Sequence, residues 1–419
     1  MTIDLFIKII GAILTFLLTM SNPLTGIYML IIAIPFLQSN ELILLYTVLV
    51  SFSFIFNAIR HKKLAYTKTA ITFPILLYLI VQIICTITSV TPMLSLQNLL
   101  VSLFSIIIFF IIINTITTKS MLDKCLKMFI FIAFVASCYG ILQYFTVGVT
   151  DLTWVDLETN PDLKTRVGGP FNNPNIFAEY LEYILPTALV LIFVYKNKIN
   201  KIILAIMSFT MLICLVLTFS RGGWLGFAAA IFFFALVKFT RYIPVLIAGG
   251  IACIPFLPNV ILTRLQSIIN FQDTSNSYRI NVWQGTIEMI KDFLFTGVGY
   301  GYWAYKSAYI HYSVNATKVW HSHNVYLQIL AETGIFGFIS FALVIISLFV
   351  LIISHNKKNN DIYSTYVSLA LLCGIISLLV HGSAEHILYM PKSIIEFWMI
   401  LGFAIAAINI NDTKKVTIK

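Results

Sequence analysis

The chain has 419 residues, of which 59% are hydrophobic and 11% are charged, and its mean hydropathy is +0.93. A soluble domain could not bury so much apolar surface, so the composition excludes one and predicts an all-α polytopic membrane protein. The formal net charge of +10 would suit a nucleic-acid partner. Most basic residues lie in short loops beside apolar segments, however, which excludes that interpretation.

Apolar segments of spanning length follow one another along the chain, about 13 in all. They run at about residues 5–20, 24–37, 41–58, 70–89, 96–116, 125–146, 176–195, 202–219, 222–238, 242–258, 325–354, 362–381 and 393–410. The first two are short and are separated by Asn22-Pro23, so we expect 12 or 13 transmembrane helices. The order predicts N-terminal transmembrane helices over 1–146, a first external loop over 147–175, transmembrane helices over 176–258, a large external loop over 259–323 and C-terminal transmembrane helices over 324–419.

The basic residues of the loops indicate which side faces the cytoplasm. Seventeen of the 27 lie in short segments on one side: Arg60, Lys62, Lys63 and Lys68; Lys119, Lys124 and Lys127; Lys196, Lys198 and Lys201; Lys238 and Arg241; Lys357 and Lys358; Lys414, Lys415 and Lys419. The positive-inside rule makes that side cytoplasmic. We therefore expect a multi-pass protein of the cytoplasmic membrane whose segments 147–175, 220–223, 259–323 and 381–392 face outward.

The large external loop is long enough to have structure of its own. Asn276–Phe293 predicts an amphipathic helix after a cap at Ser277. Its expected apolar face carries Ile280, Trp283, Ile287 and Ile290. Gly297–Gly301 should then break the chain. The aromatic run over 300–312 suits either a membrane interface, which is the favoured interpretation, or a surface that stacks on sugars.

Charged and histidine side chains gather on the expected external face. They are Arg166, Arg221, Arg264, Arg279, His321, His323, Glu332, His381, Glu385 and His386, with Glu179 and Glu182 in a nearby span. Arginine on this side runs against the positive-inside bias, and Arg221 lies in a two-glycine turn between apolar helices. Its guanidinium suits a bidentate phosphate contact or a snorkelling interfacial position, and the sequence favours neither.

His321 and His323 end the external loop, where a histidine suits a general base near neutral pH. Because they are one residue apart they cannot share a helix face, but at a loop–helix junction one of them can point into a cleft. An interfacial histidine bonded to backbone is the alternative. Zinc could in principle use His381 and His386 as further ligands, but no HExxH or cysteine set accompanies them, so we expect no metal ion and no cofactor.

The intramembrane acids form a further group. Glu179 and Glu182 are three residues apart on one helix face, and acids at that depth are functional or paired with basic groups. Glu332 lies about nine residues past His323 on the same span. It could neutralise an arginine, assist the base or form a structural pair.

Three sequence motifs follow one another along the chain, and all three are expected on the same side of the membrane. They are GGPFNNPNIFA at 168–178, TFSRGG at 218–223, and HSHN at 321–324 leading to ETG at 332–334. Tyr278-Arg279 and Trp283, followed by Gly297-Val298-Gly299, add a fourth. Together these stretches, over about 166–340, resemble the O-antigen ligase and O-antigen polymerase family of bacterial membrane glycosyltransferases.

The resemblance implies a C-type glycosyltransferase architecture that moves a glycan from a polyprenyl diphosphate carrier to an acceptor sugar hydroxyl, without a metal. His323 matches the family's catalytic histidine, and Arg221 and Arg279 match the arginines expected to hold the diphosphate. Further expected roles are catalytic for His321 and Glu332, diphosphate-binding for Arg166, and acceptor-binding or supporting for Asn324, Glu179 and Glu182. The implied partners are a lipid-linked oligosaccharide donor, a glycan acceptor and membrane lipid.

The absence of an obvious covalent nucleophile predicts an inverting single displacement. A transporter or flippase of a lipid-linked or small substrate is the main alternative, with Glu179, Glu182 and Glu332 as its coupling acids, although no inverted repeat is evident. A structural subunit of a polysaccharide-export complex is a third interpretation. The sequence does not separate polymerases from ligases.

Overall fold

The computed structural model describes residues 3–60, 67–146, 165–268, 270, 274–317 and 319–410, and within these ranges it is helical without strands. The helices are α1 (Ile3–Ser21), α2 (Pro23–Phe36), α3 (Asn40–Arg60), α4 (Thr72–Ile87), α5 (Pro92–Thr115), α6 (Lys119–Thr146), α7 (Pro174–Val194), α8 (Lys198–Leu217), α9 (Arg221–Lys238), α10 (Ile243–Cys253), α11 (Asn259–Gln266), α12 (Thr274–Phe293), α13 (Tyr302–Tyr309), α14 (Val325–Lys358), α15 (Ile362–His381) and α16 (Pro391–Asn409).

Nine helices in the described part of the chain are long and apolar enough to cross a membrane. They are α3, α5, α6, α7, α8, α9, α14, α15 and α16. The prediction of an all-α polytopic membrane protein is therefore confirmed. Three further apolar helical segments are shorter than a full span, at Pro23–Phe36, Thr72–Ile87 and Thr240–Phe256. Residues 147–164 of the first predicted loop, Lys62, Lys63 and the C-terminal lysines lie outside the described residues.

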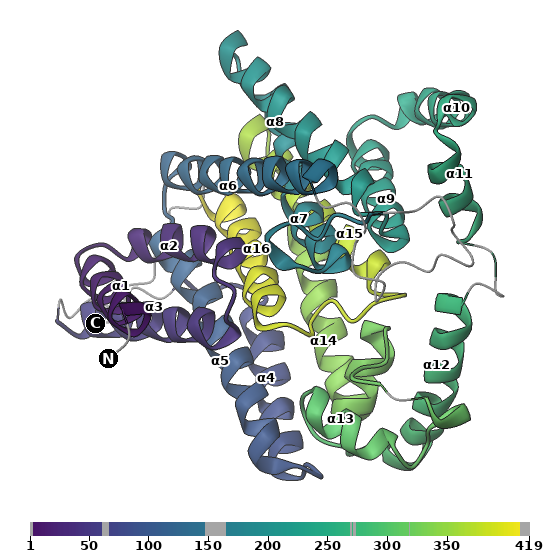
Figure 1. The fold of residues 1–419 in the computed structure, drawn as a ribbon. Helices are drawn as coiled ribbons and strands as arrows, with labels where there is room; N and C mark the ends of the chain where they lie inside the picture. Colours follow the sequence, from purple (N-terminus) through teal and green to yellow (C-terminus); the bar gives the residue numbers. More distant parts are fainter. Residues whose placement is uncertain are drawn as a thin grey trace.

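Helices α7, α15 and α16 form the centre of the bundle (Figure 1). Of the apolar stretch of α16, 94% is buried inside the protein, and the corresponding share is 78% for both α7 and α15. Small residues allow the central helices to approach closely. A Cβ atom at Gly374 of α15 would lie only 2.5 Å from the carbonyl oxygen of Tyr183 in α7. Polar side chains on these helices therefore face protein and not lipid.

Helix α14 is interrupted at Gly334, although the sequence predicted an unbroken span over 325–354. Gly334 has φ 62° and ψ −169°, a conformation that glycine adopts without the steric cost of a side chain. The interruption lets the backbone N–H of Ile335 donate to the carbonyl of Leu294 at 2.7 Å. The backbone of Val298 in turn donates to Ala331 at 2.9 Å. The glycine-rich segment after α12 is thus fixed against the first part of α14.

Helix α12 confirms the predicted helix, but its buried face and its start differ from the prediction. It begins at Thr274, so Ser277 lies inside it and is not its cap. The expected apolar residue Ile287 is 45% exposed. The buried face instead includes Gly285 and Thr286, because the Thr286 hydroxyl hydrogen-bonds with that of Tyr305 at 2.6 Å and Gly285 leaves room for the Tyr309 ring. Small and hydroxyl residues, which apolar periodicity does not count, therefore share this interface with Val282, Met289 and the predicted Ile290.

The first turns of α7 and α9, the N-terminal part of α12, the segment before α14 and the loop between α15 and α16 meet around one cleft. Asn173, Ser220 and Asn324 cap α7, α9 and α14 through their side-chain oxygens, which accept backbone N–H groups. Capping therefore fixes the start of each helix beside the cleft.

Candidate active site

The cleft has a volume of about 960 Å³ and is lined by most of the polar residues that the sequence analysis selected. Those lining it are Arg166, Glu179, Arg221, Arg264, Arg279, His321, His323, His381, Glu385 and His386. Glu182, Asn324 and Glu332 are not among its lining residues. Residues from five separate parts of the chain thus meet in one place, which sequence spacing alone could not establish.

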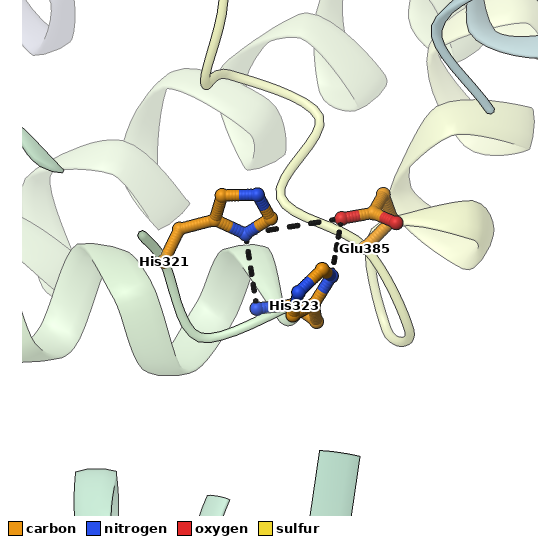
Figure 2. Close-up of side chains that lie close together, drawn as sticks. All are labelled: His321, His323 and Glu385. Atoms are coloured by element: carbon orange, nitrogen blue, oxygen red, sulfur yellow. Dashed lines mark hydrogen bonds and ion pairs between the residues drawn. The ribbon is translucent and has the colours of Figure 1, made fainter. Parts of the chain in front are cut away.

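Glu385 is the centre of the polar contacts in the cleft (Figure 2). It is 8% exposed, and its Oε1 accepts from His323 Nδ1 at 2.8 Å and from the backbone N–H of His386 at 3.0 Å. Its Oε2 accepts from Asn175 Nδ2 at 3.0 Å, and Arg279 Nη2 lies 3.8 Å away. Burial raises the pKa of this carboxyl, but contacts with the histidines and Arg279 outweigh burial and hold it well below its usual range. Glu385 is therefore an anion at neutral pH.

The bond to Glu385 orients the imidazole of His323. Because Nδ1 donates to the carboxylate, Nε2 is left to accept a proton. His323 has φ 50°, a left-handed conformation in which histidine is found more often than most residues. The turn is held from both sides, since Ser322 N donates to Gln328 Oε1 at 2.7 Å and Trp283 Nε1 donates to the Ser322 carbonyl at 3.0 Å. His323 therefore has the geometry of a general base.

His321 lines the cleft together with His323, whereas the sequence indicated only that one of the two could point into a cleft. The left-handed turn places the two rings with their centroids 4.2 Å apart. Burial lowers the pKa of His321 well below its usual range. Its Nδ1 accepts the backbone N–H of His323 at 3.3 Å, as a neutral imidazole can. The 3.8 Å separation between His321 Nδ1 and Glu385 Oε1 is therefore no ion pair.

Four arginines supply positive charge to the cleft: Arg166, Arg221, Arg264 and Arg279. Arg221 is 8% exposed and Arg166 is 6% exposed, so neither is a snorkelling surface side chain. Arg221 Nη1 donates to the carbonyl and hydroxyl of Ser267 at 2.9 and 3.1 Å. Burial, followed by the charges of the other three arginines, lowers the pKa of Arg166 well below its usual range. An anion entering this cluster would relieve that repulsion.

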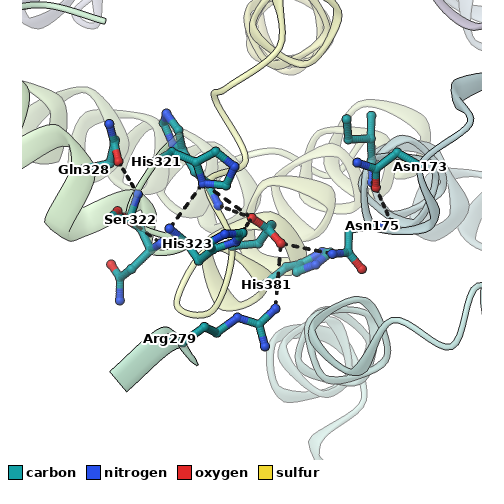
Figure 3. A network of polar contacts seen from close by, with 12 residues as sticks. Asn173, Asn175, Arg279, His321, Ser322, His323, Gln328 and His381 are labelled. Carbon is teal, nitrogen blue, oxygen red and sulfur yellow. Dashed lines mark hydrogen bonds and ion pairs between the residues drawn. The ribbon is translucent and has the colours of Figure 1, made fainter. Parts of the chain in front are cut away.

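Two helix N-termini add to the positive electrostatic potential of the cleft. Asn175 and Ile176 of the first turn of α7, and Arg221 and Gly222 of the first turn of α9, line the cleft. Helix N-termini carry a partial positive charge and favour anions such as phosphate. Figure 3 shows Asn175 and Arg279 approaching the network around His323 from different elements. The site combines an oriented histidine with a strongly anion-attracting wall.

Comparison with known proteins shows which family part of the chain is similar to. Residues 206–342 match the family model for O-antigen ligase. The resemblance read from the sequence motifs is thereby confirmed. A ComP-specific O-oligosaccharyltransferase of Acinetobacter baylyi (strain ATCC 33305 / BD413 / ADP1) is 22% identical over 230 residues, covering 52% of this chain and 40% of that protein. The chain thus spans less than half the length of this curated relative.

The O-antigen ligase match contains Arg221, Arg279, His321 and His323, whereas Glu385 lies beyond its end at residue 342. The sequence analysis placed Glu385 on the external face but gave it no role. Its position in a short His-Gly-Ser-Ala-Glu-His segment was the available signal. Its contact with His323 spans 62 residues and could be seen only in the fold.

Three residues assigned to the site, Asn324, Glu332 and Glu182, do not line the cleft. Asn324 caps α14 by accepting from Tyr326 N and Leu327 N, both at 3.0 Å, and so fixes the turn that carries His323. Glu332 Oε2 accepts from Gly301 N at 2.9 Å, and its Oε1 accepts from Gln328 Nε2 at 2.7 Å. These contacts favour positioning roles over the catalytic role expected for Glu332.

Glu182 forms a buried network beneath the Arg221 turn. Its Oε2 is 2.6 Å from His381 Nδ1, and its Oε1 accepts from Ser377 at 2.6 Å. His381 Nε2 lies 3.3 Å from the hydroxyl of Ser220, the residue that caps α9. Glu179 lines the cleft itself and accepts from Ser393 at 3.3 Å. Glu182 therefore supports the start of α9, and Glu179 faces the cleft.

The sequence predicted no metal ion, but three side chains in the cleft lie close enough together to be possible ligands. His321, His323 and Glu385 each offer a ligand atom, and these atoms lie within 4.8 Å of one another. His381, considered as a further ligand, instead contacts Glu182 and Ser220. Within the described part of the chain the cluster thus has three possible ligands in a cleft that also holds four arginines. That positive wall opposes a divalent cation.

Proposed function

We propose that this protein is a membrane glycosyltransferase that moves a glycan from a polyprenyl diphosphate carrier to a sugar hydroxyl of an acceptor, on the outer side of the cytoplasmic membrane. The observation that carries the proposal is the cleft in which the His323–Glu385 pair faces four arginines and the first turns of α7 and α9. The O-antigen ligase match and the oligosaccharyltransferase relative support the same reaction class.

The reaction begins with the donor diphosphate bound by Arg221, Arg279 and Arg166. The acceptor hydroxyl attacks the anomeric carbon of the donor sugar and gives its proton to His323 Nε2. As the bond from the anomeric carbon to the diphosphate oxygen breaks, negative charge develops on the leaving polyprenyl diphosphate and is stabilised by the guanidinium groups. Glu385 stabilises the imidazolium that forms. One displacement inverts the anomeric centre.

The test is incubation of the purified protein in lipid vesicles with a polyprenyl-diphosphate oligosaccharide, followed by separation of the products by size. Longer carrier-linked glycans would identify a polymerase, and transfer to a separate lipid or glycan acceptor would identify a ligase. Turnover should survive EDTA, because the residues above carry the proposed chemistry. Donor that remains unchanged in the presence of every acceptor tried would refute the proposal.

The transporter alternative depends on acids that change protonation during a cycle. Glu182 and Glu332 instead have close protein partners on both carboxylate oxygens. Such contacts favour fixed structural roles for two of the three acids that a transporter would use, and Glu179 alone remains in the cleft, so we retain the transferase.

The proposed reaction also requires the cleft to face outward. Single cysteines at Ser313 and Asn359, in a background without the native cysteines, would report the orientation through a membrane-impermeant thiol reagent in intact cells. We expect labelling at 313 and not at 359, because the short basic loops should be cytoplasmic. The reverse pattern would place His323 in the cytoplasm and contradict the mechanism.

A further inference from the structure

A group of aromatic rings borders the cleft on the side of the histidines. We define the aromatic ledge as Tyr302, Trp303, Trp320 and Tyr389. Tyr302 is the common neighbour, with ring centroids 5.1 Å from Trp303, 6.3 Å from Trp320 and 4.9 Å from Tyr389. Two members, Trp320 and Tyr389, line the cleft itself. The ledge is therefore a preformed surface made from three separate segments of the chain.

Trp320 packs against neighbouring side chains, and part of its surface remains exposed. Its ring packs edge-on against Trp303 at 5.5 Å, and the Lys306 ammonium lies 3.3 Å from its centroid. Even so, the residue is 49% exposed while it lines the cleft. An indole ring fixed in this way loses little conformational freedom when a ligand binds.

The ledge leads directly to the proposed base. The Tyr389 ring is 4.5 Å from the His321 ring, and the His321 ring is 4.2 Å from the His323 ring. A ligand ring resting on Trp320 and Tyr389 would thus lie next to the histidine pair. The four arginines come from other elements, so the ledge offers apolar faces where the arginine side of the cleft offers charge.

His386 lies on the same side of the cleft, next to the ledge. It is 7% exposed and lines the cleft, yet no described group lies within hydrogen-bond distance of its Nδ1. Burial lowers the pKa of His386 to about 3, so its ring is neutral. A neutral imidazole suits a hydroxyl group better than a phosphate.

We infer that Trp320, Tyr389 and His386 line the acceptor subsite, in which a neutral sugar ring stacks on the two aromatic rings and its hydroxyl groups meet the neutral His386 imidazole. A pyranose has an apolar face of C–H groups and a rim of hydroxyls, which matches this combination. The identification of the bound sugar as the acceptor rests on the proposed function. The binding of a sugar at this place can be tested without any transfer.

The first experiment uses methyl pyranosides of glucose, galactose and N-acetylglucosamine as probes, with saturation-transfer NMR on the full-length protein in detergent. Magnetisation should pass from aromatic protons to at least one probe. Trp320→Leu, which keeps apolar bulk for a membrane interface, should weaken that binding roughly 3- to 10-fold, as expected for the loss of aromatic stacking. His386→Phe, which keeps a ring but removes the nitrogens, should also weaken it.

Phe295→Leu is the matched control, since Phe295 is 68% exposed and packs on Phe336 away from the lining of the cleft. Binding of the probes should be unchanged in this variant. Equal saturation transfer in the parent and in Trp320→Leu, or no transfer to any probe in the parent, would overturn the inference and leave Trp320 as an interfacial anchor.

The second experiment separates this inference from the proposed function. In the transfer assay, Trp320→Leu should raise KM for the acceptor while the dissociation constant for the polyprenyl-diphosphate donor stays within about twofold of the parent. Weakened donor binding with an unchanged acceptor KM would contradict the assignment. If no transfer occurs in the parent but the probes bind the ledge, the proposed function fails and the sugar site stands.

Discussion

Two buried glutamates, Glu385 and Glu332, differ in what surrounds them. Glu332 is 5% exposed, and its oxygens accept from a backbone N–H in a glycine-rich segment and from a glutamine one turn earlier. It lines a cavity of about 30 Å³. Glu385 is 8% exposed and lines a cleft of about 960 Å³ beside histidine and arginine side chains. The comparison teaches that burial alone does not distinguish a structural carboxylate from a functional one.

The residues that each glutamate fixes explain the difference. Glu332 joins the 297–301 segment to α14, so its contacts shape the scaffold. Glu385 holds His323 through Nδ1 and receives Asn175 from the start of α7. A change at Glu385 should therefore act on chemistry, and a change at Glu332 should act on stability. The following variants test that division.

The largest effect is expected for His323→Ala, which removes the group that Glu385 orients. Loss of a general base should lower turnover by about 10²–10⁴-fold. Folding should be little changed, because the turn is also held by Ser322 and Trp283. His311→Ala is the matched control, since His311 is exposed in the same external segment. Near-normal turnover by His323→Ala would transfer the role to another group.

The second-largest effect is expected for Arg221→Lys and Arg279→Lys, which should weaken binding of the donor. Each change keeps the positive charge but loses the planar fork that can grip a diphosphate. Affinity for the polyprenyl-diphosphate donor should fall roughly 10- to 100-fold per charged hydrogen bond lost. Arg241→Lys, at an exposed position away from the cleft, is the control. Donor binding that equals the parent in both cleft variants would reduce these arginines to a structural role.

Glu385→Gln should lower turnover by roughly 10- to 100-fold, because an amide can no longer stabilise the imidazolium or fix the ring as a carboxylate does. The donor dissociation constant should change less than turnover. Glu288→Gln, which removes an exposed acid paired with Lys291, serves as the control. Parent-like turnover would place Glu385 beside Glu332 as a structural group.

The sequence predicted the arginines and histidines of the cleft because they lie in compact motifs, each readable within a few residues. It did not predict the role of Glu385, whose partners are 62 and 210 residues away. It assigned Glu332 a catalytic role because the break at Gly334 and the return of residues 297–301 could not be foreseen from apolar periodicity. Spans follow from local hydropathy, whereas the direction of a buried side chain depends on the packing of distant segments.

Glu332→Gln should lower stability and leave turnover nearly unchanged, which is the opposite of the effect expected for Glu385→Gln. Glutamine offers one oxygen where two donors, Gly301 N and Gln328 Nε2, now bond to carboxylate oxygens. One donor would be left facing an NH₂ group, at a cost of about 1–3 kcal/mol in the free energy of unfolding. Thermal melting in detergent should show this loss, while turnover per folded molecule stays within about threefold. A large loss of turnover at unchanged stability would restore the catalytic role.

The smallest expected effect is the pH dependence of the stability that Glu385 contributes. Because contacts with His323 and Arg279 outweigh burial and lower the pKa of Glu385 in the folded protein below its ordinary value of 4.5, its ionised form adds stability above that value. As the pH falls below about 4.5 the unfolded chain takes up the proton first, and the contribution is lost towards the folded pKa. The difference in Tm between the parent and Glu385→Gln should therefore be constant from about pH 8 to pH 6 and shrink below about pH 4.5. A difference that grows on acidification would mean that Glu385 is protonated in the fold, and His323 would then lack the anion that orients it.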